Sequence, residues 1–301
     1  MSERVGQPYP RNNHRLILVV STLITLVAIF THLYRLGDLW PVPYFDPAYN
    51  GLDALRVIRR GITPIFFPTN GGREPLFIYL QALSMGTFGV NSFALRLPGA
   101  LAGALAVPAL FGLARLLWRE DGRLPADWAA IWAALGLALS VWHVSQARLG
   151  LRTALLPLAS IATMWLFVDG WRRASLPRLA AAGALLGLTA YTYTAARFLP
   201  FVLALAVLPD LLAKRRASDV SRRQRWLGFG LLALTAFVIF APLGWYYLDH
   251  RAMFAERATS VMVWNVWQPG LGTTLVEEIA LNVWRTVSWF ARFPCPSSPP
   301  W

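Results

Sequence analysis

Uncharged apolar stretches about 20 residues long recur along this sequence, and they limit what the chain can fold into. Examples are residues 16–34, 97–114, 128–147, 179–196 and 226–248. Each is close to the ~20 residues that an α-helix needs to cross the ~30 Å hydrocarbon layer of a bilayer. The composition agrees, because only 14% of the residues are charged, whereas roughly a quarter are charged in a soluble domain. The sequence therefore predicts an all-α integral membrane protein.

The net charge of +13 is consistent with this prediction. It comes from 28 basic residues, of which Lys214 is the single lysine. In a soluble protein such a balance indicates nucleic acid, but here the charges lie between the apolar stretches, so we expect anionic lipid headgroups as partners and no nucleic acid. The single Cys295 excludes an internal disulfide and a cysteine metal cluster.

The number of spans depends on residues 75–95, which are uncharged but lose their apolar character after Phe88. If this segment does not span, the loops predicted inside the cell carry fifteen basic residues and the outer short loops carry five. The positive-inside rule favours that topology. The sequence thus predicts seven spans with a cytoplasmic N-terminus, at residues 16–36, 96–117, 128–146, 152–171, 179–196, 198–213 and 226–248.

The predicted organisation is a seven-span module over residues 1–250, followed by an extracytoplasmic or interfacial tail over residues 251–301. Residues 37–95 form a long outer loop. An interfacial helix is expected from Leu275 to Phe293, and the closing stretch FPCPSSPPW is typical of an irregular or truncated end. We expect a multi-pass protein of the cell membrane.

The outer loop holds the first candidate site residues, in YFDPAYNGLDALRVIRRG. Asp46 and Pro47 suit a helix N-cap and the first helical position. From Asp46, the residues Tyr49, Asn50 and Asp53 follow at i+3, i+4 and i+7, so one helical face is polar. Asp46 then has two interpretations: it caps a helix on the membrane surface, or it removes a proton from an acceptor hydroxyl.

The next candidates lie in TNGGREPLFIYL, where two glycines allow a tight turn before a helix that begins near Pro75. The Arg73 guanidinium precedes this helix and suits a phosphate. Glu74 either belongs to the site or simply complements the helix dipole.

These segments resemble the bacterial polyprenyl-phosphate-dependent glycosyltransferases of the GT-C fold, a group that includes the protein O-mannosyltransferases. The matching elements cover roughly residues 16–200 in order: the first apolar helix, FDPAYNGLDA, GGREPLFIYLQALSMGTFG, RLPGALAGALAVPALFGLARLLW and SQARLGLRTALLP. The resemblance implies a GT-C-type bundle. It also implies that Asp46 is the catalytic base, although many relatives have Asp-Glu where this chain has Asp46 and Pro47.

The resemblance further implies cations near the lipid phosphate. Many relatives have Lys-Pro-Pro where this chain has Arg73, Glu74 and Pro75, and a basic residue in their second outer loop. The predicted phosphate-binding residues are therefore Arg73, Arg148, Arg152 and Arg197, with Tyr49, Asn50, Asp53 and Glu74 near the sugar or acceptor. Each of the last three arginines has an alternative interpretation, which is anchoring at the membrane interface by snorkelling.

The expected reaction transfers a sugar from a polyprenyl-phosphate lipid to the hydroxyl of a protein, lipid or glycan at the outer face. No cofactor is evident, and nothing in the sequence supports a divalent metal, because Asp-x-Asp, Walker lysine and GxGxxG motifs are absent. Two alternatives remain. One is a transporter or lipid flippase, although the spans are nearly free of the midplane charges that such proteins use. The other is a non-catalytic assembly subunit.

Overall fold

The computed structural model describes residues 12–39, 45–118, 126–212, 219–254 and 274–291, and these residues are mainly helical. Their only extended pairing is an isolated bridge between Phe67 and Arg73. The all-α prediction is confirmed. The helices are α1 (Asn12–Leu33), α2 (Phe45–Arg60), α3 (Leu76–Phe88), α4 (Ser92–Trp118), α5 (Ala126–Leu139), α6 (Val141–Arg148), η1 (Arg152–Ala154), α7 (Leu155–Arg172), α8 (Leu176–Thr189), η2 (Thr194–Phe198), α9 (Leu199–Leu212), α10 (Asp219–Asp249) and α13 (Leu275–Ala291).

Each predicted span contains helical residues in the described part of the chain. Among the residues that the structure describes, four helices can cross a bilayer by length and composition, and a fifth crossing results if α5 and α6, which meet at a bend of 53°, count as one span. This makes the chain a multi-pass membrane protein. The predicted span 179–196 is wrong in its bounds, because α8 covers Leu176–Thr189 and the apolar residues after it form a turn and η2. The count of seven stays a prediction.

Residues 75–95 do not form one continuous helix. Helix α3 has 13 residues, which is roughly 20 Å at 1.5 Å per residue and too short for a ~30 Å hydrocarbon layer. It ends at Phe88 and is capped by Gly89, whose φ of 82° is left-handed. Asn91 then joins the two helices, because its side chain accepts from Ala94 N at 2.8 Å and donates to Phe88 O at 2.9 Å. The next span, α4, therefore starts as a separate helix.

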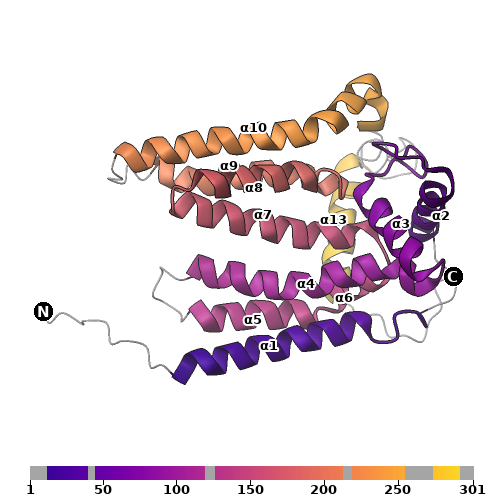
Figure 1. Cartoon of the computed structure of the whole chain (residues 1–301), viewed down its shortest axis with the longest axis horizontal. Coiled ribbons are helices and arrows are strands. Elements are labelled where there is room, and N and C mark those ends of the chain that lie inside the picture. The colour runs from indigo at the N-terminus through magenta and orange to yellow at the C-terminus, as the bar shows by residue number, and fades with distance from the viewer. Residues whose placement is uncertain (1–11, 40–44, 119–125, 213–218, 255–273, 292–301) are drawn as a thin grey trace, which may run out of the picture. The chain divides into compact units, whose positions relative to one another are not determined.

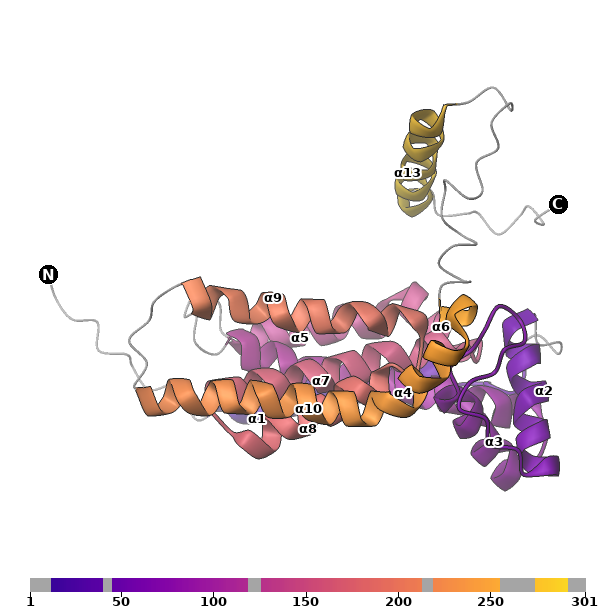
Figure 2. The same cartoon turned by 90° about the horizontal axis from the view of Figure 1, so that it is seen from above.

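The long helices run side by side, and α2 and α3 lie together at one end of this bundle (Figures 1 and 2). Helix α4 is central, because it packs against α1, α5 and α7, while α7 also packs against α8. One hydrophobic cluster joins α7 to α10 through Phe167, Leu179, Leu203 and Leu232. The loops at the α2–α3 end are where the candidate site residues meet.

Glycines allow α8 and α10 to approach closely, as small residues do between membrane helices. A Cβ added at Gly187 would lie 2.6 Å from Ala236 O and 2.8 Å from Ile239 Cβ, whereas a Cβ at Gly136 of α5 would meet nothing within 4 Å. We therefore expect Gly187→Ala to destabilise the protein by about 1–3 kcal/mol through overpacking. Thermal unfolding of the purified protein in detergent measures this effect. Gly136→Ala is the matched control, and equal stability of the two variants would contradict the packing described.

The chain divides into two compact units, residues 1–246 and 247–301. In the second unit, α13 begins with a reciprocal capping box. Thr274 N donates to Glu277 Oε2 at 2.8 Å, and Glu277 N donates to Thr274 Oγ1 at 3.3 Å. The hydrogen bond from the Thr274 backbone lowers the pKa of Glu277 below its ordinary value. The helix predicted from Leu275 is thus present and ends at Ala291, while its interfacial location stays a prediction.

Candidate active site

A tight loop between α2 and α3 organises the site. Asn70, Gly71 and Gly72 have φ values of 55°, 70° and 76°, all left-handed. The loop closes where Phe67 N donates to Arg73 O at 2.9 Å and Arg73 N donates to Phe67 O at 2.8 Å. A Cβ on Gly72 would lie 2.7 Å from the Phe66 ring, so this position requires glycine. The turn sends the side chains of Arg73 and Glu74 to different partners.

Arg73 is fully buried, and its guanidinium points at the polar face of α2. It donates through Nη1 to Asn50 Oδ1 at 2.9 Å and through Nε to Thr69 O at 3.1 Å, and Nη2 forms an ion pair with Asp53. The Tyr49 ring centroid lies 5.8 Å from its Cζ. The polar face predicted for α2 is therefore confirmed, and it packs on the loop. Arg73 precedes a helix that begins near Pro75, as the sequence predicts, and its guanidinium bonds to residues of α2.

Asp46 lies on the same helix as Asn50 and Asp53, and its carboxylate is half-buried. Helix α2 begins at Phe45, so Asp46 lies in the first turn and not at the N-cap that the sequence predicts. Its Oδ1 accepts a hydrogen bond from Asn70 Nδ2 at 2.7 Å. Among the described residues its Oδ2 has no hydrogen-bond partner, and Tyr49, one turn further along, is 43% exposed. A carboxylate held by one oxygen is placed to accept a proton through the other.

Glu74 and Arg152 form a second buried ion pair, with 2.9 Å between Arg152 Nη1 and Glu74 Oε2. Thr194 Oγ1 donates to Glu74 Oε1 at 2.8 Å, and Arg152 Nη1 also donates to Gly72 O at 3.1 Å. The Tyr193 ring centroid lies 5.3 Å from Arg152 Cζ. The pair joins the α2–α3 loop to η1 and η2. Because Arg152 is buried, it does not snorkel to the membrane interface as its alternative interpretation requires.

The two remaining predicted arginines are Arg148, four residues before Arg152, and Arg197. Arg148 donates to the end of α1, through Nη1 to Thr31 O at 2.5 Å and through Nη2 to Tyr34 O at 2.7 Å, which are carbonyls that a helix C-terminus leaves without partners. Arg197 is half-buried in η2, three residues after Thr194.

The sequence analysis missed Asn70, Thr69 and Thr194 as site residues. The sequence contains a clue for the first, because Asn before Gly-Gly is typical of a left-handed turn. No local pattern indicates that Thr194 bonds to Glu74, which is 120 residues away. Within the described residues, no three His, Cys, Asp or Glu side chains lie together as a metal site requires.

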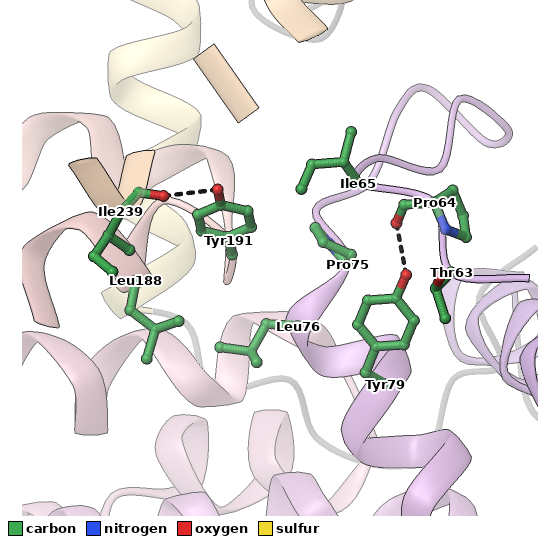
Figure 3. A pocket seen from close by; sticks show the side chains of 9 residues that line it. All are labelled: Thr63, Pro64, Ile65, Pro75, Leu76, Tyr79, Leu188, Tyr191 and Ile239. Atoms are coloured by element: carbon green, nitrogen blue, oxygen red, sulfur yellow. Dashed lines mark hydrogen bonds between the residues drawn. The ribbon is translucent and has the colours of Figure 1, made fainter. Parts of the chain in front are cut away.

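An apolar pocket of about 460 Å³ includes Pro75, the residue after Glu74, in its lining, and Figure 3 shows the side chains around it. The lining residues come from the α2–α3 loop, α3, the end of α8 and α10: Thr63, Pro64, Ile65, Pro75, Leu76, Tyr79, Leu188, Tyr191 and Ile239. Both tyrosine hydroxyls are satisfied by backbone, since Tyr79 donates to Pro64 O at 2.7 Å and Tyr191 donates to Ile239 O at 2.8 Å. Burial raises the pKa of Tyr79. The pocket therefore offers a mainly apolar surface.

Comparison with known proteins adds a family and named relatives. Residues 72–246 match the family described as dolichyl-phosphate-mannose-protein mannosyltransferase. A Pseudomonas paraeruginosa protein named undecaprenyl phosphate-alpha-4-amino-4-deoxy-L-arabinose arabinosyl transferase is 31% identical over 236 residues, which are 77% of this chain and 40% of that protein. A Pseudomonas aeruginosa protein of the same name is 30% identical over 75% of this chain and 38% of its own length. The chain thus spans about two fifths of these relatives. The matched range includes Arg73 and Arg152, the arginines of the two buried ion pairs, but it begins after Asp46.

Proposed function

This chain belongs to the dolichyl-phosphate-mannose-protein mannosyltransferase family, and on that premise we propose that it transfers a sugar from a polyprenyl-phosphate lipid to an acceptor hydroxyl at the outer face of the cell membrane. The names of the Pseudomonas relatives supply the donor class, which is a sugar linked to undecaprenyl phosphate. The acceptor is a protein, lipid or glycan. Family membership favours transfer over the transporter and flippase alternatives.

The observation that supports this function best is the state of Asp46. Its carboxylate is half-buried, engages Asn70 through Oδ1 and has no partner for Oδ2 among the described residues. In the proposed step the acceptor hydroxyl gives its proton to Asp46, and its oxygen bonds to the anomeric carbon of the sugar. The bond from that carbon to the phosphate oxygen breaks, and polyprenyl phosphate leaves with the electron pair. The proposed step uses no metal or cofactor.

The arginines have different roles in this proposal. Arg73 and Arg152 hold the loops around Asp46, because each is buried in an ion pair, and Arg148 holds the end of α1. Arg197 is half-buried, and its short helix also carries Thr194, the partner of Glu74. Because Thr194 holds this helix at the Glu74–Arg152 pair, we assign the phosphate contact to Arg197, whose fixed charge would stabilise the leaving group.

The apolar pocket is the proposed seat of the first isoprene units of the donor. Its lining includes Pro75, which directly follows Glu74. An isoprenoid chain lying there would therefore bring its phosphate end towards the α2–α3 loop. The aliphatic and aromatic lining suits an isoprenoid, since burial contributes roughly 25 cal/mol per Å² of apolar surface.

Filling this pocket should weaken donor binding. We expect Leu188→Trp to raise the KM for an undecaprenyl-phosphate donor by about 10-fold, because one to two kcal/mol of apolar contact is lost. Steady-state kinetics in detergent micelles measures the change. Leu205→Trp is the control, because Leu205 is 65% exposed on α9 and outside the pocket. An unchanged KM in Leu188→Trp would place the lipid elsewhere.

The function itself is tested with the purified chain in liposomes that contain undecaprenyl phosphate-linked 4-amino-4-deoxy-L-arabinose. An envelope extract serves as the source of acceptors. The expected result is release of free undecaprenyl phosphate together with labelled acceptor. Movement of intact donor between leaflets without release would instead support a flippase. The absence of both release and movement would support a non-catalytic subunit.

A further inference from the structure

Asn70 contacts the proposed base directly, although nothing in its sequence context indicates a catalytic role. Its side-chain Nδ2 donates to Asp46 Oδ1 at 2.7 Å across 24 residues of sequence. Both side chains are half-buried. A charge-assisted hydrogen bond of this kind restrains the carboxylate plane. The bond therefore fixes the direction in which Oδ2 points.

The residue before Asn70 is held by Arg73 and Asp53. Thr69 Oγ1 accepts from Arg73 Nη2 at 2.5 Å and donates to Asp53 Oδ2 at 3.4 Å, while Thr69 O accepts from Arg73 Nε at 3.1 Å. Asn70 itself has a φ of 55°, a conformation that asparagine adopts more readily than most other residues. The loop thus presents the amide to Asp46 from a defined position.

We propose that Asn70 is a positioning residue of the transfer reaction: it holds Asp46 by one oxygen so that the other faces the acceptor hydroxyl. This inference rests on the proposed base role of Asp46. In this proposal the Arg73–Asp53 pair also helps to position Asp46, because that pair holds the loop that carries Asn70. Asn70 does not touch the reacting atoms and acts through Asp46.

The conformation of Asn70 determines which variants are informative. Asn70→Gly keeps the left-handed backbone without strain and removes only the amide. Asn70→Asp is isosteric and also tolerates this conformation, but it replaces the donor with a second carboxylate. We expect kcat to fall about 10-fold to 100-fold in both variants, as loss of a hydrogen bond to a charged group predicts. We expect the KM for the undecaprenyl-phosphate donor to change less than about 2-fold, because the bond orients the base and does not bind the donor.

A second measurement does not depend on turnover. The accessible carboxylates are modified with a water-soluble carbodiimide and an amine, and the products are quantified by mass spectrometry. Asp38, whose side chain is 62% exposed, provides the internal reference. Labelling of Asp46 relative to Asp38 should rise in Asn70→Gly, because its bonded oxygen becomes free. Asn91→Ser is the matched control, since Asn91 caps α4 at another loop of the chain.

The outcomes separate the two proposals. Increased Asp46 labelling with a reduced kcat supports the positioning role. If Asp46 labelling increases in Asn70→Gly but the wild-type protein transfers no sugar, the contact between Asn70 and Asp46 is supported and only the proposed function is overturned. Unchanged labelling in Asn70→Gly, or an unchanged kcat in both Asn70 variants of an active protein, overturns the role of Asn70.

Discussion

Replacing Asp46 with asparagine is expected to lower sugar transfer by at least about 1,000-fold, within the range for loss of a general base. The substitution keeps the size of the side chain and an oxygen that can accept the hydrogen bond from Asn70, which is 2.7 Å from Asp46 Oδ1. It removes the group that takes the acceptor proton. Release of undecaprenyl phosphate from the labelled donor measures the rate, and expression and membrane insertion should match those of the wild type.

Asp38→Asn is the control for this prediction. Asp38 lies just after α1, is well exposed and pairs with Arg35 three residues before it. Its removal should therefore leave transfer unchanged. Full transfer by Asp46→Asn would remove the base assignment and would favour the other interpretation of Asp46, in which its carboxylate serves only the first turn of α2.

The second large effect concerns Arg73. Arg73→Ala leaves the buried Asp53 carboxylate without its main cation and Asn50 without its donor. Breaking one side of a buried pair costs about 3–5 kcal/mol, so we expect a correspondingly lower free energy of unfolding. Chemical or thermal unfolding of the purified protein in detergent measures this loss.

Arg56→Ala provides a matched control, because Arg56 binds the other oxygen of the same carboxylate. Arg56 Nη1 lies 2.7 Å from Asp53 Oδ1, but its side chain is 55% exposed. Its removal should cost only about 0–1 kcal/mol. If Arg73→Ala is as stable as Arg56→Ala but loses affinity for the donor, the phosphate contact predicted from the sequence is right and the structural role is wrong.

Much of the fold could be predicted because apolar stretches and helical spacing are local properties. The uncharged stretch at residues 16–34 became α1, and the loss of apolar character after Phe88 marked the end of α3 at Gly89. The polar face of α2 followed from the spacing of Asp46, Asn50 and Asp53. The end of α8 was misplaced because its apolar pattern continues through a turn, and hydrophobicity alone does not distinguish a helix from a buried turn.

The partners of the charged side chains could not be predicted in the same way. The direction of Arg73 depends on three consecutive left-handed residues that begin at Asn70. The Glu74–Arg152 pair joins residues 78 apart, and only the packing of the bundle brings them together. The resemblance implied phosphate-binding arginines. It could not show which of them are buried in ion pairs, because a buried arginine and an exposed one have the same local sequence pattern.

The catalytic proposal depends on which side of the membrane Asp46 occupies. In a Cys295→Ser background, Asp46→Cys and Arg173→Cys place single thiols in the first turn of α2 and in the connection between α7 and α8. A membrane-impermeant maleimide applied to intact cells should label position 46, whereas position 173 should react only after the membrane is permeabilised. Labelling of both positions from the same side would contradict the arrangement in which the carboxylate meets its lipid donor at the outer face.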